Sequence, residues 1–278
     1  MIDNERLILL SNDDGIRSPG LWAAAEALST LGYVVVAAPR EQQSAMGRSK
    51  PTIFDRSVHK ETMTVGGQSW EVYAIAGSPA QCVSTSIREL LPRKPDLVVA
   101  GINYGENLGT SVTVSGTVGA ALEGASYGVP GLAVSLQTPP EFHFSYSEEI
   151  CFDAAAHFTG LFGKLLMEEA NGRAYDVLKV DVPADATVET PWEMTRVSRN
   201  RYYFQKAFLG RKVEEGELRY RAETGHENDK QSDIYVVRVK KHVSISPLTL
   251  DLTAGVDRSE LAETFCRRIA DSKERNQE

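Results

Sequence analysis

Short apolar runs alternate with segments of helical periodicity from the start of the chain to residue 182. The apolar runs are typical of strands buried on both faces, and they occupy residues 7–11, 33–38, 96–100, 131–136 and 175–182. Helical periodicity marks the segments between them, at residues 19–31, 79–91, 115–127 and about 147–170. Strands that alternate with helices pair in parallel through right-handed crossovers. The pattern therefore predicts an α/β fold with a Rossmann-like, mostly parallel sheet and helices on both faces.

Two parts of the chain depart from this alternation. Residues 62–65 and 70–75 flank Gly66 and Gly67, which predicts a β-hairpin. Beyond residue 182 the chain carries charged, β-prone pieces without intervening helices, at residues 194–197, 201–204, 234–239 and 243–245. Isolated hairpins are marginal in water, so this region is expected to need a partner surface.

The predicted domain organisation follows from these patterns. Residues 1–182 form the Rossmann-like catalytic core, and residues 183–255 form a projecting β-rich oligomerisation arm. Residues 259–273 are amphipathic and predict a helix, so residues 256–278 are expected to return to the core. The alternative is a compact second lobe that packs on its own core.

The composition excludes several classes of protein. With 42% hydrophobic and 24% charged residues it is typical of a soluble globular protein, and no apolar run is long enough to cross a bilayer. The first residues lack a signal segment, so a cytoplasmic location is expected. A net charge of −8 disfavours duplex nucleic acid as a partner. Three distant cysteines, without a Cys-x-x-Cys pair, argue against a disulfide framework and a zinc ribbon.

Three loops that follow predicted strands carry the polar residues of interest. Asp13 and Asp14 follow the first strand, Ser44 lies after the second, and Asn103 follows the strand at residues 96–100. Ligands of doubly wound sheets bind beyond the carboxyl ends of the strands. Adjacent buried carboxylates call for a cation, and hydroxyl and amide oxygens are further hard ligands, so we predict Mg²⁺ or Mn²⁺ here. Taken alone, each residue would equally suit a turn or a solvated loop.

The predicted helix at residues 115–127 begins with a small polar segment. Ser115, Gly116 and Thr117 would present free backbone amides to an anion such as phosphate. A serine cap followed by small residues for close packing is the other interpretation, and both can hold. No P-loop, dinucleotide fingerprint or Gly-x-Ser-x-Gly elbow is present, which disfavours those classes of enzyme.

These segments resemble the SurE survival-protein family over nearly the whole chain. The matching motifs are residues 9–16, Ala38 and Pro39 leading to Gln43 and Ser44, residues 101–109, 115–118, 77–83 and 243–248. The resemblance implies a metal-dependent phosphatase of nucleoside 5′- and 3′-monophosphates, with a C-terminal arm exchanged between subunits in dimers or tetramers. Two positions depart from the family pattern and bear on nucleotide preference: Gln81 stands where many members carry an acid, and Ala45 where a glycine often follows the serine.

The resemblance also implies roles for individual residues. One divalent cation per subunit would be held by Asp13, Asp14, Ser44 and Asn103. Asn107, Ser115, Gly116 and Thr117 would lie beside the phosphate. Asp13, Asp14, Asn107 and Ser115 would be the catalytic residues.

Three other functions remain open from the residues alone. A receiver-type domain also binds Mg²⁺ through an acidic pair, but it needs a phosphoacceptor aspartate in the region where Asn103 and Asn107 stand. A haloacid-dehalogenase-like phosphatase forms an aspartyl-phosphate and requires Asp-x-Asp rather than Asp-Asp. A nucleotide-binding protein without turnover is the third.

Overall fold

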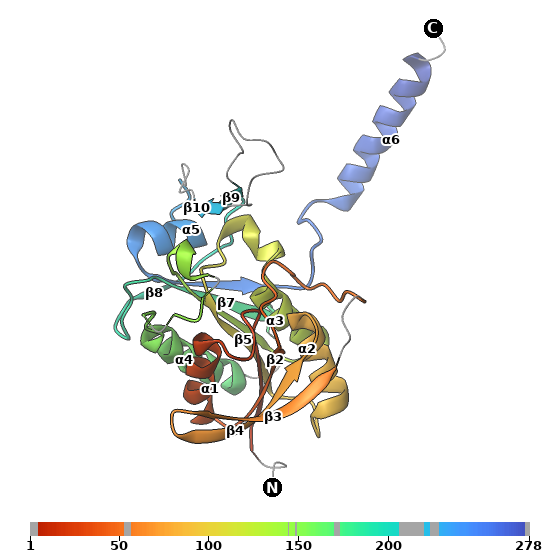
Figure 1. Cartoon of the computed structure of the whole chain (residues 1–278). Helices are drawn as coiled ribbons and strands as arrows, with labels where there is room; N and C mark the ends of the chain where they lie inside the picture. Colours follow the sequence, from red (N-terminus) through yellow and green to blue (C-terminus); the bar gives the residue numbers. More distant parts are fainter. Residues whose placement is uncertain are drawn as a thin grey trace, which may run out of the picture.

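The computed structural model describes residues 5–52, 57–143, 145–147, 149–169, 173–205, 220–222 and 228–275. Its strands form a nine-stranded sheet in the order β3-β4-β2-β1-β5-β6-β7-β11-β8, and a two-stranded sheet of β9 and β10 (Figure 1). The strands are β1 (Leu7–Ser11), β2 (Tyr33–Pro39), β3 (Val58–Val65), β4 (Gln68–Ile75), β5 (Leu97–Tyr104), β6 (Gly131–Leu136), β7 (Val177–Val182), β8 (Trp192–Met194), β9 (Tyr203–Gln205), β10 (Tyr220–Ala222) and β11 (Val243–Leu248).

The centre of the large sheet is parallel, as the sequence predicts. Strands β4, β2, β1, β5, β6 and β7 all run in the same direction. The predicted hairpin around Gly66 and Gly67 is confirmed, because β3 pairs antiparallel with β4 at one edge of the sheet. The predicted α/β fold with a mostly parallel sheet is therefore confirmed.

Helices cover both faces of the sheet (Figure 1). The helices of the core are α1 (Pro19–Ser29), α2 (Pro79–Thr85), α3 (Gly116–Ser126) and α4 (Asp153–Glu168). Ile8 and Leu10 of β1 pack in one hydrophobic cluster with α1 and α4. Leu7 and Leu9 pack in a second cluster with α2 and α3 on the opposite face. Burial on both faces is the reason that β1 is a continuous apolar run rather than an alternating one.

The helix boundaries follow from local capping and packing. The Ser78 hydroxyl accepts a hydrogen bond from the Gln81 amide at 3.2 Å, and the Gln81 side chain accepts one from the Ser78 amide at 2.9 Å, so these two residues cap α2. Helix α4 begins at Asp153, later than predicted, and Phe152 directly before it packs edge-on against Tyr104 at 5.0 Å between ring centroids. Short turns of other helix types lie at Ser86–Leu90, Gly109–Thr113, Pro140–Phe142 and Val236–Lys240.

The order of the strands reverses between β1 and β5. The chain leaves β1 for β2 and β4 on one side, and returns to β5 on the other side of β1. Open α/β sheets bind their ligands beyond the carboxyl ends of the strands at such a reversal. The loops after β1 and β5 are therefore brought together where a ligand site is expected.

The predicted arm is partly incorporated into the main sheet. Strand β11 pairs antiparallel with β7, and β8 pairs parallel with β11, so both extend the core sheet by hydrogen bonding. Only the short antiparallel pair of β9 and β10 forms a separate sheet within the described residues of this region. Residues 206–219 and 223–227 of the predicted arm lie outside the described residues.

Residues 234–239 are helical, so their prediction as a strand is wrong. Helix α5 (Asp233–Tyr235) continues into the turn Val236–Lys240. The Ser232 hydroxyl caps α5 by accepting from the Tyr235 amide at 3.1 Å, and the buried Asp233 carboxylate accepts from the Ser198 amide at 2.9 Å. These caps and tertiary hydrogen bonds override the β-propensity of the valines, which is a weak local preference.

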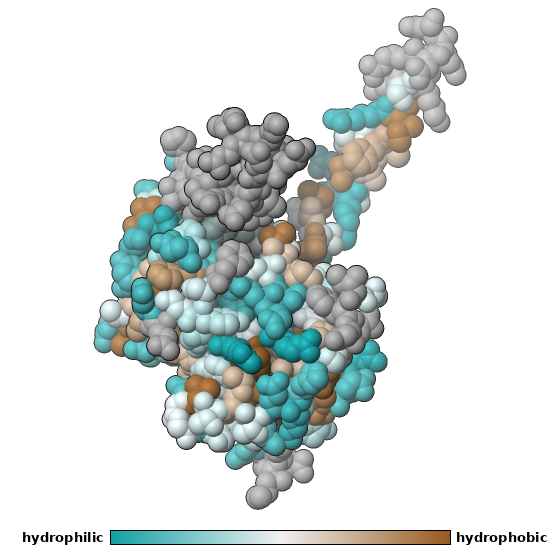
Figure 2. All heavy atoms as spheres, in the orientation of Figure 1, coloured by the Kyte–Doolittle hydropathy of each residue, from teal (hydrophilic) through white to brown (hydrophobic). Residues whose placement is uncertain are grey.

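The C-terminal helix α6 (Arg258–Arg275) stands away from the rest of the chain, as Figure 1 shows, instead of returning to the core of its own subunit. Its apolar stripe is exposed, with Leu261 at 41%, Phe265 at 53% and Ile269 at 55% of full accessibility, and Figure 2 shows apolar residues along it. The segment before it is exposed as well, so within the described residues the stripe has no surface of its own chain to cover it. In the part of the chain that the structure describes, no helix has both the length and the apolarity that a membrane crossing needs.

Candidate metal and phosphate site

The acidic pair lies in a tight turn directly after β1. The Asn12 side chain holds this turn, accepting from the Gly15 amide at 3.1 Å and donating to the Gly15 carbonyl at 3.0 Å. Gly15 adopts a φ of +100°, which favours glycine. The turn aims both carboxylates inward, and Asp13 and Asp14 are only 5% and 2% exposed.

The two carboxylates of the pair contact different neighbouring segments, which are the start of α3 for Asp13, and the end of β5 and the loop after β2 for Asp14. Asp13 accepts a hydrogen bond from the Thr117 hydroxyl at 2.6 Å. Asp14 accepts from the Tyr104 amide at 3.1 Å and from the Gln42 side chain at 3.2 Å. All of these donors are neutral, so hydrogen bonds orient the carboxylates without balancing their charge.

The electrostatics of the pair favour an external cation. Burial raises the pKa of Asp13 to about 6, although the Thr117 hydrogen bond opposes this shift. Burial raises the pKa of Asp14 well above its ordinary value, and the neighbouring Asp13 charge adds to the effect. A divalent cation bound between the carboxylates would replace their lost hydration and favour the ionised forms.

The loop after β2 brings Ser44 beside the pair. The Gln43 amide, one residue before Ser44, donates to the Asp13 carbonyl at 2.7 Å. The Ser44 side chain is exposed and makes no hydrogen bond within the described residues. Ala45 adopts a φ of +60°, a left-handed conformation that favours glycine. A glycine at this position would fit this conformation without strain.

Asn103 lies near the end of β5, next to the residue whose amide binds Asp14. Its side-chain nitrogen donates to the Gly105 carbonyl at 2.7 Å and to the Tyr104 carbonyl at 3.3 Å. These bonds fix the amide so that its oxygen is the atom left for a ligand. The side chains of Asn103 and Ser44 make no direct hydrogen bond to either aspartate within the described residues.

The start of α3 is packed directly on the acidic pair. A Cβ added to Gly116 would lie 2.7 Å from the Asp13 Cβ and 2.7 Å from its Oδ2, so a side chain has no room there. The Ser115 hydroxyl caps the helix, accepting from the Val118 amide at 3.1 Å. Ser115 therefore does cap α3. The first-turn amides of Gly116 and Thr117 hydrogen-bond the Asp13 carboxylate, which shows that this helix start stabilises negative charge.

Asn107 reaches the same edge of the sheet by way of β6. Its side-chain nitrogen donates to the Ser135 hydroxyl at 2.8 Å, and Ser135 is the register partner of Asn103 in the pairing of β5 with β6. Its backbone amide donates to Asp181 at 2.7 Å, and its carbonyl accepts from Lys179 at 3.0 Å. Asn107 is 9% exposed and is held from three sides.

Several residues that the sequence analysis did not identify contribute to this region. Lys179 and Asp181 are charges two residues apart inside an apolar strand, a pattern that could have indicated a paired buried role. Gln42 binds Asp14, and the Tyr146 hydroxyl donates to the Asp14 carbonyl at 2.8 Å. Neither carries a sequence signal that sets it apart from other loop residues.

The oxygen donors fit Mg²⁺ or Mn²⁺ better than a softer metal. Within the described residues no group of three or more histidine, cysteine, aspartate or glutamate side chains could hold a metal. A cation at this edge would therefore be held by the two carboxylates together with neutral oxygens, a donor set that suits hard divalent ions.

Comparison with known proteins agrees with the architecture and with the motifs. The family model described as survival protein SurE matches residues 8–204. The chain belongs to the SurE survival-protein family. A protein named 5′-nucleotidase SurE from Thermococcus gammatolerans is 38% identical over 253 residues, covering 90% of this chain and 92% of the relative. A protein of the same name from Methanococcus vannielii is 39% identical over 255 residues, covering 88% and 93%.

A solved structure of a SurE protein shows the same fold. The crystal structure of the SurE protein from Aquifex aeolicus is 33% identical in sequence, with a TM-score of 0.68, and covers 89% of this chain and 94% of that one. Of the motifs that carry the resemblance, residues 9–16 and 101–109 lie at the reversal point of the sheet. At the departure from the family pattern, the Gln81 side chain donates to the Pro51 carbonyl at 2.9 Å in addition to capping α2.

Proposed function

We propose that the chain is a divalent-metal-dependent phosphomonoesterase that hydrolyses nucleoside 5′- and 3′-monophosphates to nucleoside and phosphate. The observation that carries this proposal is the packing of Gly116 and Thr117 against Asp13. It puts a pair of carboxylates suited to a cation next to a helix start suited to an anion. The substrate class is supported by the relatives named 5′-nucleotidase SurE.

The proposed ligands of one cation, Mg²⁺ or Mn²⁺, are Asp13, Asp14, Ser44 and Asn103. The bound cation would supply Lewis-acid polarisation of the phosphoryl group and would acidify water at neutral pH. Asp13 or Asp14 would accept the proton of the attacking water, since both are buried carboxylates near the start of α3 where the phosphate is proposed to bind. The burial of both carboxylates keeps bulk water from competing for them.

The remaining site residues would stabilise the charge that develops on the phosphoryl oxygens. The Thr117 hydroxyl and the backbone amides of Gly116 and Thr117 all hydrogen-bond Asp13 in this structure. The two amides are the proposed donors to the phosphoryl oxygens when substrate is bound. The Ser115 hydroxyl oxygen accepts from Val118 and keeps its own proton to donate. The Asn107 amide nitrogen gives one proton to Ser135 and keeps a second for the phosphate.

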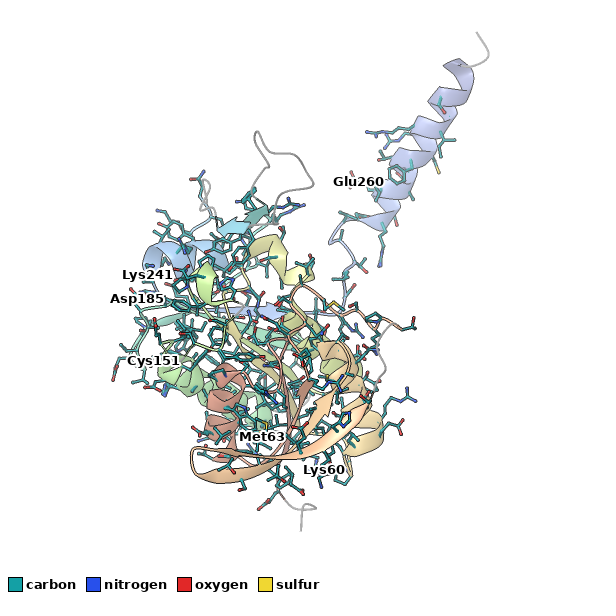
Figure 3. The ribbon with its side chains drawn as sticks, viewed as in Figure 1. Lys60, Met63, Cys151, Asp185, Lys241 and Glu260 are labelled. Atoms are coloured by element: carbon teal, nitrogen blue, oxygen red, sulfur yellow. The ribbon has the colours of Figure 1, made fainter. Side chains whose placement is uncertain are left out.

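The test is phosphate release from a panel of nucleoside monophosphates, after the protein has been treated with a chelator. Release is expected to require added Mg²⁺ or Mn²⁺, and to fall at least about 100-fold in Asp13→Asn, because several kcal/mol of transition-state stabilisation depend on the cation. The matched control is Asp185→Asn, an exposed aspartate labelled in Figure 3, which should keep full activity. Turnover without metal would contradict the proposal, and a trapped phosphoryl-aspartate would indicate the covalent mechanism instead.

We further propose that the chain forms homodimers or homotetramers through exchange of its C-terminal region. The support is the apolar stripe of α6, whose three large side chains are each more than two-fifths exposed. Such a stripe on an isolated helix is expected to be covered by a second subunit. Light scattering should give a multimeric mass for the full chain and a smaller mass for the variant Leu261→Ser/Phe265→Ser/Ile269→Ser. A monomeric mass for the unaltered chain would contradict this.

A further inference from the structure

Three charged side chains are completely buried beneath the loop that carries Asn107. Lys179 and Asp181 project from the same face of β7, and Asp233 begins α5. All three are 0% exposed. Lys179 forms ion pairs with both carboxylates, and its nitrogen lies 3.1 Å from Asp233. We call Lys179, Asp181 and Asp233 the charged triad.

Two members of the triad hold both backbone polar groups of Asn107. Asp181 accepts from the Asn107 amide at 2.7 Å, and Lys179 donates to the Asn107 carbonyl at 3.0 Å. The Lys–Asp pair on one strand therefore fixes the peptide planes on both sides of the Asn107 Cα. With the backbone fixed, the Ser135 hydrogen bond leaves the Asn107 side chain little freedom.

The third member extends the same network along the loop. Asp233 accepts from the Gly109 amide at 3.1 Å with one oxygen and from the Ser198 amide at 2.9 Å with the other. Residues 107 and 109 are thus both anchored to the triad. The region around Ser198, which lies far along the chain, is tied to the same point.

Stability alone is a poor explanation for such a network. Buried ion pairs lose so much hydration that apolar residues of the same volume are often equally stable or more stable. What the triad does provide is fixed orientation, since three of its four carboxylate oxygens and its ammonium group each contact a particular backbone group. Burial lowers the pKa of Lys179, but the two carboxylates outweigh this effect and raise it above its ordinary value, so the lysine remains charged.

We propose that Lys179, Asp181 and Asp233 are positioning residues that hold the Asn107 side chain in line with the scissile phosphate. The inference rests on the proposed function, because it needs Asn107 to face the phosphate. It adds a set of residues that touch neither substrate nor cation and act only through Asn107.

A double-mutant cycle between Lys179 and Asn107 tests this inference. Lys179→Met is expected to lower kcat about 10- to 100-fold, since a small misplacement of a catalytic group has effects of that size, with KM changed less than about threefold. In the Asn107→Ala background the same substitution should lower kcat by less than about threefold, because the group being positioned is gone. Lys60→Met is the matched control, since Lys60 is an exposed lysine on the β3 hairpin, paired with Glu71 (Figure 3). It should leave kcat unchanged.

A kcat for Lys179→Met within about threefold of the unaltered protein would overturn the inference, as would losses that multiply in the double variant. Full activity in Asn107→Ala would overturn it too, while leaving the nucleotidase activity in place. Absence of metal-dependent phosphate release from the unaltered protein would instead defeat the proposed function.

A readout that does not depend on turnover keeps these failures distinct. Amide hydrogen exchange in residues 105–109 should become faster in Lys179→Met and stay slow in Asn107→Ala, which keeps the backbone contacts. Exchange that is unchanged in Lys179→Met would count against the triad even in an inactive protein.

If Lys179→Met fails to fold, the double variant Lys179→Met/Asp181→Asn takes its place in the test. Its remaining buried charge, Asp233, keeps hydrogen bonds from the amides of Gly109, Ser198 and Ile234. The side-chain oxygen that Asp181→Asn retains can still accept from the Asn107 amide, so the double variant removes mainly the lysine contact to the Asn107 carbonyl. The same loss of kcat is expected in it, and unchanged kcat would overturn the inference.

Discussion

Two sets of buried carboxylates lie at the same edge of the sheet, and they differ in how their charge is balanced. Asp181 and Asp233 share Lys179, an internal cation that is itself completely buried. Within the described residues, Asp13 and Asp14 have only neutral donors, from Gly116, Thr117, Gln42 and Tyr104. The two sets are otherwise alike in burial and in the use of backbone amides.

The difference separates a scaffold from a binding site. A carboxylate pair with its own lysine is complete without a ligand, and removal of the lysine leaves unpaired charge. A pair without a lysine is complete only when a cation arrives from solution. On the proposed function, the lysine-balanced set holds the loop and the acidic pair binds the metal.

Substitutions that remove one charge from each set should have effects of opposite sign on stability. In metal-free buffer at pH 7.5, Lys179→Met is expected to lower the free energy of unfolding by about 3–5 kcal/mol, because it leaves buried carboxylates unpaired. Asp13→Asn should raise it by roughly 1–3 kcal/mol, because it removes a charge that burial disfavours. Urea unfolding measures both values. Destabilisation by Asp13→Asn would show that the acidic pair is already balanced.

The acidic pair should also make metal binding strongly dependent on pH. The pKa values of the pair are raised in the folded, metal-free protein, so the folded state favours the protonated carboxyl groups. The stability that protonated Asp13 contributes is therefore fully present below pH 3.8 and is lost as the pH rises through about 6. A cation binds the ionised carboxylates, so a bound cation makes the protein more stable at higher pH. Below about pH 6 the affinity for the cation should weaken about tenfold per pH unit for each proton that binding displaces.

The measurement is the rise in melting temperature on adding Mg²⁺ or Mn²⁺, between pH 5 and pH 7.5. The rise should be larger at pH 7.5, and it should be nearly absent at both values in Asp13→Asn. Burial also raises the pKa of Asp181 to about 6, but that group lies in the lysine-balanced set, so it should not alter the difference between metal-bound and metal-free protein. A rise independent of pH would contradict the raised pKa values.

The smallest expected effect concerns the strained loop beside the acidic pair. Ala45→Gly should raise the free energy of unfolding by about 1 kcal/mol, because glycine adopts the left-handed conformation at +60° without a steric penalty. The stabilisation by added metal should be unchanged in Ala45→Gly, since the backbone conformation around Ser44 stays the same. Guanidinium unfolding, with Ala184→Gly as a substitution in another exposed loop, would check it. A lower free energy of unfolding in Ala45→Gly would show that the left-handed conformation of residue 45 does not strain the loop.

The core of the fold could be predicted from the sequence because its strands are buried on both faces. The continuous run Leu7–Ser11 and the glycines of the hairpin are local signals that tertiary contacts reinforce. The acidic pair was predictable for the same reason, since it directly follows such a strand. The helix from Asp233 was not, because its buried aspartate is satisfied by residues distant in the sequence.

The triad itself was also beyond the reach of sequence patterns. Lys179 and Asp181 interrupt an apolar run, but their partners Asn107 and Asp233 lie about 70 residues before and 50 residues after them in the sequence. Likewise, nothing in the amphipathic pattern of α6 says whether its apolar stripe packs on its own subunit or on another. Periodicity identifies which face is apolar, and only three-dimensional contacts identify what covers it.

The charges on β7 also constrain how the sheet can assemble. Val177 packs in the cluster with α2 and α3, and Lys179 and Asp181 project from the same face of β7, whereas Leu178 and Val180 pack in the cluster with α1 and α4. A slip of one residue between β6 and β7 would turn the ammonium group of Lys179 into the apolar cluster formed with α1 and α4. A misaligned β7 would therefore bury an unpaired charge and be unstable, so these charges favour the correct register at the carboxyl edge of the sheet during folding.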